Sequence, residues 1–475
     1  MKIRQPHFLL WVATILLVCI ITLPRLIQHG MFMDGELYAS VAHNLAHGLG
    51  SFWFPTFNEY VHPLFDQQPP LTFGIQALFF KIFGDSMYVE RVYDFIFCLI
   101  HVLLIHLIWK EIFKQSELKK LSWLPIVLWF SIPVCSWDFV NNMEEITMGV
   151  FVQLSILFAV KNIFSNKNNF IYAFLSGVSL ITAWLCKGFP GLFPLTTFFF
   201  AFIFFKQFNI KKAALNYAAM LLSIATIIIA LYFYSPANKC LSTYLNNRVL
   251  NSIKNVAETD NRFYMWGRLL SELIIPFLIV AIVLGIKWIK KEKITFDKKG
   301  SVFFISLGLS GVLPLIVTLE QRGFYMVTAL PCFAISLSIL IAPTINEWIN
   351  LFHQQITKWL KPLCAAGFIT LTLSLFFLHN EFTRSENALS DIYQFGKIIP
   401  QHSTIGVSND LYEDWGTGCY FQRFYFIAVD GCTKDWNTHP FVMINKSTAA
   451  NYISFLKAYK KIDLYTQQFD LYQHK

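Results

Sequence analysis

Apolar stretches long enough to cross a lipid bilayer recur along most of this 475-residue chain. A helix of about 20 apolar residues spans the hydrocarbon core of a membrane. The sequence therefore predicts an all-α multi-pass membrane protein with about 11 transmembrane helices. The apolar stretches fall near residues 8–27, 88–109, 122–139, 146–163, 170–186, 189–205, 213–234, 269–289, 301–318, 323–342 and 362–379.

The composition agrees with this prediction. Hydrophobic residues make up 55% of the sequence and charged residues only 14%, with a mean hydropathy of +0.49. A soluble domain carries about 25% charged residues, so a large soluble enzyme is excluded. The net charge is +9, but the basic residues form short clusters between apolar stretches, a pattern typical of membrane proteins. It does not indicate a nucleic-acid partner.

The basic clusters also predict how the chain lies in the membrane. Lys2 and Arg4 precede the first apolar stretch, which is longer than a signal-peptide core of about 7–15 residues and is predicted to be retained. Further lysines follow the second, fourth, sixth, eighth and tenth stretches. Because positively charged loops stay in the cytoplasm, we expect a cytoplasmic N-terminus. With an odd number of spans, the C-terminus then lies outside.

The first outer loop, residues 28–87, is predicted to be folded. Apolar side chains from Leu37 to Leu49 recur at helical spacing. Pro70–Phe83 is a second apolar helix, too short to cross a membrane. Both helices are expected to lie at the membrane interface.

The composition changes again near residue 380. Alternating apolar runs at Thr404–Val407, Tyr425–Val429 and Phe441–Ile444, separated by turn residues, predict a small C-terminal α/β domain. The expected domains are a transmembrane domain, residues 1–379, and a periplasmic domain, residues 380–475.

Four polar clusters interrupt the apolar sequence, and the predicted topology places all of them on the outer side. Polar and ionisable groups at membrane depth are costly and usually mark a functional site. We therefore expect the clusters to converge on a reaction centre at the membrane surface. They are Asp34-Gly35-Glu36, the run from Asp66 to Leu71, the run from Asn141 to Glu145, and Lys187-Gly188.

Each charged residue in these clusters also has a simpler interpretation. Asp34 stands at N-cap distance from a predicted helix, so it could cap the helix, act as a proton acceptor, or do both. An ammonium at Lys187, between two spans, is costly without an anionic partner, but it could reach the interface instead. Glu144 and Glu145 could bind hydroxyl groups or simply be solvated in a turn.

Several short motifs occur in an order that is more informative than any of them alone. The motifs are Asp34 followed by Tyr38-Ala39, then Phe52–Pro55, Pro69-Pro70-Leu71, Phe83-Gly84, Glu90-Arg91, Lys187-Gly188, Gln321–Tyr325 and Leu330-Pro331. Over roughly residues 8–345, this order resembles the membrane glycosyltransferases of the GT-C fold that use polyprenyl-phosphate sugars. That family includes protein O-mannosyltransferases and the aminoarabinose transferases of lipid A.

The resemblance implies a GT-C-like fold and roles for the residues that match the family's motifs. Asp34 stands at the position of the catalytic aspartate, which implies a general base for the acceptor. Lys187 and Arg322 match positions that hold the donor phosphate, and fixed positive charge stabilises an anionic leaving group. The remaining expected substrate-binding residues are Glu36, Arg91, Tyr325, Glu144 and Glu145.

The sequence departs from the family pattern in two places. Where the family usually has Asp-Glu, this chain has Asp34-Gly35, with Glu36 one residue later. Where an acidic residue and a Lys or His usually precede Pro-Pro, this chain has Gln67-Gln68, with Asp66 displaced by one. No cofactor is required by the motifs, and a divalent metal would have only His62 and Asp66 as candidate ligands.

The predicted function is an inverting glycosyltransferase, a hexosyl- or pentosyltransferase, that moves a sugar from a polyprenyl-phosphate donor to a lipid, glycan or protein acceptor on the outer face. The donor and membrane lipid are the expected partners. One alternative is a transporter or flippase of lipid-linked substrates, although such proteins usually show internal repeats and midplane charge, and we find no repeat. A non-catalytic assembly or sensor protein would leave the first-loop motif unexplained.

The short tail favours a bacterial inner membrane, because the family's eukaryotic relatives carry a larger luminal domain. This predicts a cell-membrane protein with a cytoplasmic N-terminus and a periplasmic C-terminus. Cys419 and Cys432 would then lie in an oxidising compartment, where a disulfide between them could form.

Overall fold

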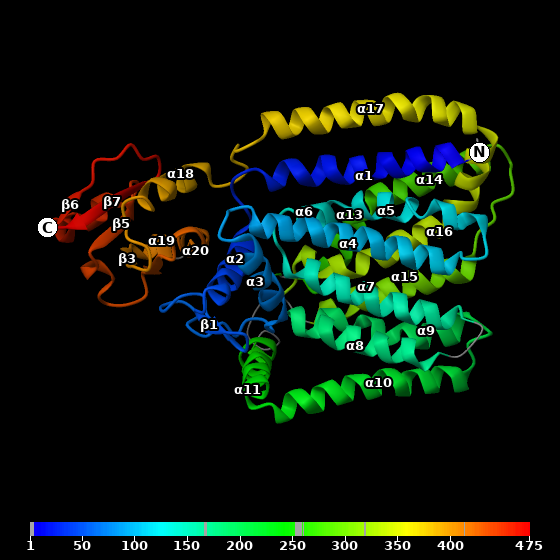
Figure 1. The fold of residues 1–475 in the computed structure, drawn as a ribbon, viewed down its shortest axis with the longest axis horizontal. Helices are drawn as coiled ribbons and strands as arrows, with labels where there is room; N and C mark the ends of the chain where they lie inside the picture. Colours follow the sequence, from blue (N-terminus) through cyan, green and yellow to red (C-terminus); the bar gives the residue numbers. More distant parts are fainter. Residues whose placement is uncertain (1–3, 166–168, 252–258, 260, 318–319, 413) are drawn as a thin grey trace.

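The computed structural model describes residues 4–165, 169–251, 259, 261–317, 320–412 and 414–475. Long helices run side by side along the longest axis of the molecule, and the C-terminal tail lies at one end of them (Figure 1). We call this the tail end of the bundle. The N-terminus lies at the opposite end.

Within the described residues, eight helices are long and apolar enough to cross a membrane, or nine if one bent pair counts as a single span. The bent pair is α13 (Tyr264–Glu272) and α14 (Ile274–Ile289), which meet at 51°. The chain is thus a multi-pass membrane protein. The eight helices are α1 (Arg4–Leu26), α4 (Val89–Ile112), α7 (Glu144–Ile163), α8 (Phe170–Lys187), α10 (Ile210–Phe233), α15 (Lys298–Val312, extended by a 3₁₀ turn, η4, Leu313–Val317), α16 (Leu330–Leu351, preceded by η5, Gly323–Ala329) and α17 (His353–Phe377).

The predicted count of eleven spans is not confirmed, because two of the expected segments are broken. Residues 122–139 form α5 (Leu124–Phe130) and α6 (Pro133–Asp138), and the break precedes Pro133, which cannot donate a helical hydrogen bond. Residues 189–205 form a 3₁₀ segment, η2 (Phe189–Thr196), and the short α9 (Thr197–Phe204). Each piece is helical, but none is long enough to span alone.

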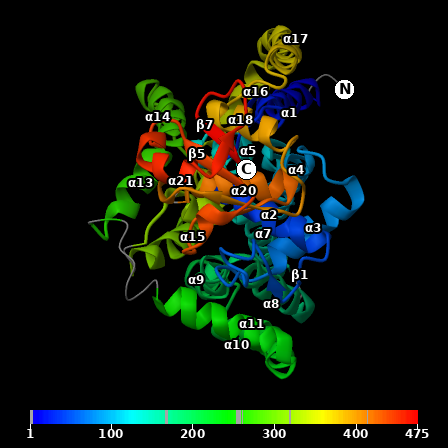
Figure 2. The same cartoon turned by 90° about the vertical axis from the view of Figure 1, so that its left-hand side faces the viewer.

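The first outer loop packs against the tail end of the bundle. It contains α2 (Met33–Ala46), a small hairpin of β1 (Gly50–Ser51) and β2 (Phe54–Pro55), and α3 (Leu71–Phe83). A core that includes Val41, Phe65, Phe73 and Phe80 joins α2 to α3. Most of α2 is buried, since it lies between the bundle and the tail and not on an open interface (Figure 1; the tail end faces the viewer in Figure 2).

Short elements complete the bundle. A 3₁₀ turn, η1 (Glu117–Leu121), follows α4. At the tail end, α10 leads into α11 (Ser235–Thr243) and a π-helical turn, η3 (Tyr244–Leu250). These two elements lie beside the first outer loop (Figure 1).

The tail is an α/β unit with a five-stranded mixed sheet in the order β4-β3-β5-β7-β6. Strand β3 is parallel to β4 and β5, whereas β7 is antiparallel to β5 and β6. Its core contains Leu389, Ile405, Phe421 and Met443. The elements are α18 (Glu386–Phe395), β3 (Thr404–Val407), α19 (Asn409–Tyr412), α20 (Trp415–Tyr425), β4 (Ala428–Asp430), η6 (Trp436–Thr438), β5 (Phe441–Asn445), η7 (Ala449–Tyr452), α21 (Ile453–Leu456), β6 (Tyr459–Lys461) and β7 (Phe469–His474).

Helix α20 attaches the tail to α2. Gln422 donates a hydrogen bond from Nε2 to Oδ1 of Asn44 at 3.0 Å, and the Tyr420 hydroxyl contacts the backbone of Met31. The strand expected at residues 425–429 begins later, at Ala428, because α20 continues to Tyr425.

Candidate active site

The last residue of α8 carries the charge at the centre of the candidate site. Lys187 is only 5% exposed, and its Nζ lies 2.7 Å from Oε1 of Glu145 and 3.6 Å from Oε2 of Glu144. Both glutamates lie in the first turn of α7, where the helix dipole favours anions. Lys187 therefore points into the protein and does not reach the membrane interface.

Three aromatic rings surround the same ammonium. The Nζ of Lys187 lies 5.6 Å from the ring centroid of Tyr38, 5.5 Å from that of Phe324 and 5.6 Å from that of Tyr325. Cation–π contacts of this kind stabilise a charge that has lost its water. The predicted residues Lys187, Glu144, Glu145 and Tyr325 are thus brought together, although they come from three separate parts of the sequence.

The turn after Lys187 depends on glycine. Gly188 has φ +99°, which residues with a side chain rarely adopt. A Cβ at this position would also lie 2.1 Å from the hydroxyl oxygen of Tyr244 in η3. Gly188 therefore lets α8 end next to η3 and holds Lys187 at the tail end of the bundle.

Asp34 lies in the first turn of α2 and is half-buried. Its neighbour Tyr38 connects it to the lysine cluster. Burial raises the pKa of the Tyr38 phenol well above its ordinary value. Lys187 opposes this shift, whereas the two glutamates and Asp34 add to it. Asp34 and Tyr38 are four residues apart on α2 and therefore share the helix face from which Tyr38 contacts the Lys187 ammonium.

The position of Gly35 gives a physical reason for the departure from the family's Asp-Glu pattern. A Cβ at residue 35 would lie 1.9 Å from the backbone oxygen of Asn141. The Asn142 side chain donates a hydrogen bond to the Gly35 oxygen at 2.8 Å, and Gln76 donates one to Asn142 at 2.5 Å. The start of α2 thus packs directly on the turn before α7, where only glycine fits.

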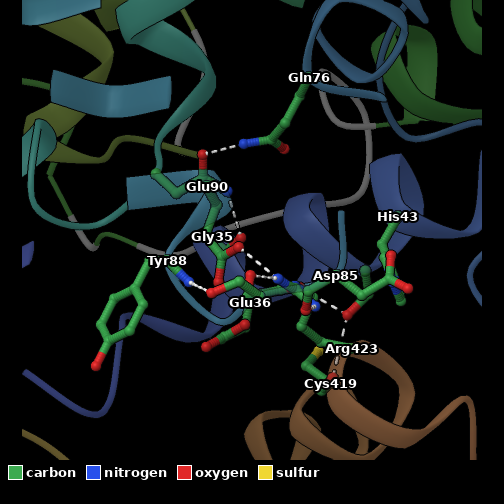
Figure 3. A network of polar contacts seen from close by, with 12 residues as sticks. Gly35, Glu36, His43, Gln76, Asp85, Tyr88, Glu90, Cys419 and Arg423 are labelled. Carbon is green, nitrogen blue, oxygen red and sulfur yellow. Dashed lines mark hydrogen bonds and ion pairs between the residues drawn. The ribbon is translucent and has the colours of Figure 1, made fainter. Parts of the chain in front are cut away.

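Glu36 lies in a different environment from Asp34. Its side chain is 1% exposed and faces Glu90 and Arg423 (Figure 3). Within the part of the chain that the structure describes, neither carboxylate oxygen has a hydrogen-bond partner. Burial and the neighbouring Glu90 raise its pKa to about 8, although Arg423 and Arg91 lower it. Arg423 comes from α20 and pairs with Glu90 at 2.7 Å. Glu36 therefore belongs to the contact between α2 and the tail and is not in the lysine cluster.

Arg91 also lies outside the lysine cluster. Its guanidinium donates hydrogen bonds to the backbone oxygens of Arg25 at 3.2 Å and Gly30 at 3.4 Å. The side chain is 2% exposed and holds the connection between α1 and α2. This arrangement favours a structural role at this position.

Arg322 immediately precedes η5, which supplies Phe324 and Tyr325 to the lysine cluster. The Tyr325 hydroxyl donates to Oε1 of Glu320 at 3.3 Å, and Arg248 of η3 forms an ion pair with the same carboxylate. Sequence reasoning missed Arg248 and Tyr244, because residues in η3 match no motif and only the fold brings them here.

Among the described residues, neither His62 nor Asp66 belongs to a group of three or more metal-binding side chains. The His62 ring packs at 5.6 Å from that of Phe65 and 5.5 Å from that of Trp415. Asp66 accepts hydrogen bonds from Asn247 at 2.8 Å and Gln67 at 3.0 Å. Across the described part of the chain, the group of three or more metal-binding side chains that lie close together is a different one, His43, His47 and Asp85.

An apolar groove of about 410 Å³ lies beside the lysine cluster, between α8, η2, α10 and α11. Trp184 and Phe189, which flank Lys187-Gly188, line one side, and Leu231, Tyr232 and Leu245 line the other. The residues that line the groove are almost all apolar, and Trp184 and Phe189 lie within three residues of Lys187 in the sequence.

The disulfide expected between Cys419 and Cys432 is absent, and all nine cysteines are free. Cys419 is buried in α20, where its backbone oxygen accepts a hydrogen bond from Ser40 of α2. Cys432 is exposed in the turn after β4. The packing of α20 on α2 thus buries the thiol of Cys419, whereas that of Cys432 stays exposed.

Comparisons with known proteins bear on this fold and site. Residues 67–233 match the model of the dolichyl-phosphate-mannose-protein mannosyltransferase family. The crystal structure of ArnT from Cupriavidus metallidurans bound to undecaprenyl phosphate is similar with a TM-score of 0.67 at 10% sequence identity, covering 98% of this chain and 97% of that one. Its apo structure gives 0.66 at 11% identity and 95% of each chain.

A more distant similarity extends to the archaeal oligosaccharyltransferase AglB from Archaeoglobus fulgidus, in complex with an inhibitory peptide and a dolichol-phosphate. Its TM-score is 0.51 at 10% identity, covering 99% of this chain and 74% of that one. No curated protein matches the sequence.

The fold is that of a multi-pass GT-C membrane protein with a small C-terminal sheet region. This fold agrees with the resemblance found in the sequence, and residues 67–233 carry the additional similarity to the mannosyltransferase family model.

Proposed function

We propose that this protein is an inverting glycosyltransferase that moves a sugar from a polyprenyl phosphate to an acceptor on the outer face of the cell membrane. The observation that carries the proposal is the buried Lys187, which pairs with two glutamates and contacts Tyr38, one helical turn after Asp34. A proton acceptor, a cation and an apolar groove, such as the one lined by Trp184 and Phe189, are what this reaction needs.

The groove suits the prenyl chain of the donor, because burial of apolar surface contributes about 25 cal/mol per Å² to the free energy of binding. A chain bound against Trp184 and Phe189, which flank Lys187-Gly188 in the sequence, would bring the attached phosphate to Lys187. Since Glu144 and Glu145 already face this ammonium, the phosphate would share it with them. Arg322 is the second cation that we assign to the phosphate.

In the proposed reaction, Asp34 takes the proton of the acceptor hydroxyl, and the acceptor oxygen forms a bond to the anomeric carbon of the sugar. The bond from that carbon to the phosphate oxygen breaks on the opposite side, so the configuration inverts. The polyprenyl phosphate leaves with the bonding electron pair, and Lys187 stabilises its charge. Glu144 and Glu145 accept hydrogen bonds from the sugar's hydroxyl groups.

We further propose that residues 1–379 form the membrane domain, that residues 380–475 form a periplasmic domain, and that the N-terminus is cytoplasmic. The first outer loop and the tail lie at the same end of the bundle as the site (Figure 1). A periplasmic site at that end is what the positive-inside rule requires. The tail would then cover the outer loop and limit which acceptors reach Asp34.

The decisive experiment is transfer by the purified protein in proteoliposomes that contain a polyprenyl-phosphate sugar. Asp34→Asn keeps the size of the side chain but cannot take a proton, so we expect the rate to fall by about 10²–10⁴-fold. Asp410→Asn, which changes an exposed carboxylate of the tail, is the matched control and should keep full activity.

The readout is release of free polyprenyl phosphate together with glycosylated acceptor. Near-normal release by Asp34→Asn would remove this residue from the base role. Movement of the intact donor across the membrane without any release would refute transfer and support transport instead.

A further inference from the structure

Two histidines of α2 and one aspartate converge at the edge of the first outer loop. His43 and His47 are four residues apart and therefore lie on one face of the helix. Asp85 comes from the turn between α3 and α4. Its Oδ1 lies 3.1 Å from Nε2 of His43 and 2.7 Å from Nε2 of His47. One atom from each residue lies within 4.8 Å of the other two.

We propose that His43, His47 and Asp85 bind a divalent transition metal ion, with Zn²⁺ as the best fit. Two imidazoles and one carboxylate are a common zinc ligand set, with bonds of about 2.0–2.2 Å in tetrahedral geometry. Ligand atoms on such an ion are a little over 3 Å apart, close to the two distances seen here. Calcium and magnesium prefer oxygen ligands and do not match this set.

The surroundings permit an additional positive charge. A cation beside the group is Arg423, whose guanidinium contacts the backbone oxygen of Asp85 at 3.3 Å. It is already paired with Glu90 at 2.7 Å, so its charge is largely neutralised. Asp85 and His47 are 53% and 39% exposed, respectively, which leaves room for water at the fourth position.

Phe426 orients the two imidazole rings from the tail. Its ring stacks on His43 at 4.4 Å with an interplanar angle of 23°, and its edge contact with His47 is 5.0 Å. Metal-bound histidines usually gain orientation from a hydrogen bond at the other ring nitrogen. Nδ1 of His43 has no such partner among the residues that the structure describes, so stacking on Phe426 takes this positioning role.

A bound ion would join three parts of the protein: the last turn of α2, the turn between α3 and α4, and, through Phe426, the docked tail. Asp34 lies at the other end of α2. The ion would therefore fix the orientation of the helix that carries the proposed base, without touching the substrate. Metal binding can be tested whether or not the protein transfers sugar.

The test is a Zn²⁺ titration of the full-length protein, purified in detergent without a histidine tag and stripped with EDTA, in competition with a chelating dye. We expect one Zn²⁺ per chain. His47→Ala and Asp85→Asn should each weaken binding more than about 10-fold. Both side chains are partly exposed, so their removal opens no cavity in the core. His62→Ala, in the same outer loop, is the matched control and should bind like the wild type.

Phe426→Leu should weaken binding while leaving all three ligands in place, which distinguishes a positioned site from loose histidine binding. A Co²⁺-loaded protein should show visible absorption bands of tetrahedral intensity that His47→Ala loses. Wild-type protein that binds no Zn²⁺ would overturn the proposal, and so would His47→Ala and Asp85→Asn variants that bind Zn²⁺ as tightly as the wild type.

Discussion

Replacing Glu36 by glutamine should make the stability of the protein less dependent on pH. Burial and Glu90 hold the pKa of Glu36 at about 8, compared with an ordinary value of 4.5. The folded protein therefore keeps this proton between pH 4.5 and about 8, whereas the unfolded chain releases it. Since the folded state binds more protons in this window, the stability of the wild type should fall as the pH rises through it.

The size of the effect follows from the same shift. Each pKa unit corresponds to about 1.4 kcal/mol, so moving from 4.5 to about 8 gives a loss on the order of 4–5 kcal/mol across the window. Glu36→Gln carries no titrating group and should lose this pH dependence. The two proteins should be similar near pH 5, and the variant should be the more stable one near pH 8.

The assay is thermal unfolding in detergent, followed by tryptophan fluorescence from pH 5 to pH 8.5. Glu386→Gln, an exposed change in the first turn of α18, is the control and should follow the wild type. If the stability of Glu36→Gln changed with pH in the same way as that of the wild type, the conclusion that Glu36 is buried as a neutral carboxyl would be refuted. Transfer activity in this variant should stay near normal, because Glu36 faces the tail and not Lys187.

Three further predictions concern charges and topology. Lys187→Ala should weaken binding of labelled donor and slow turnover while the protein still inserts into the membrane. Lys187→Arg should recover only part of the donor binding, because a planar guanidinium replaces a compact ammonium among three rings. Unchanged donor binding in Lys187→Ala would contradict the phosphate role. Arg423→Met should lower stability in chemical denaturation by about 3–5 kcal/mol, because Glu90 stays buried without its partner, and adding Glu90→Gln should restore much of the loss. Reporter fusions after Lys120 and after Asn380 should report opposite sides of the membrane; the same side for both would contradict the proposed orientation.

The sequence was sufficient to predict the broad architecture, because apolar length and motif order are local properties. All eleven expected apolar segments are helical in the described residues, and the tail has the expected sheet. The span count could not be predicted from mean hydropathy. Pro133 and the prolines of η2 break two of the segments, and these breaks do not change the average hydropathy of the segments. The partners of Lys187 could not be predicted from the sequence either, since Glu145 and Tyr325 come close to it only through the packing of α7 and η5.

The group of His43, His47 and Asp85 could be predicted from the sequence only in part. The spacing of His43 and His47 predicts a common helix face, but nothing in the sequence near Asp85 indicates that it completes a group of three. That contact depends on how α3 folds back on α2. A sequence search for metal ligands therefore finds His62 and Asp66, which stand near a motif, and misses the set that the fold assembles.

The rotation of α2 about its axis decides which acidic residue faces the lysine cluster. Two residues separated by two positions on a helix point roughly 200° apart, so Asp34 and Glu36 cannot both face Lys187. The contact of Gly35 with the oxygen of Asn141 fixes this rotation, because a side chain at residue 35 would lie 1.9 Å from that oxygen. It directs Glu36 towards Arg423 and leaves Asp34 beside Tyr38. The glycine that departs from the family pattern is thus the residue that keeps the aspartate at the candidate site.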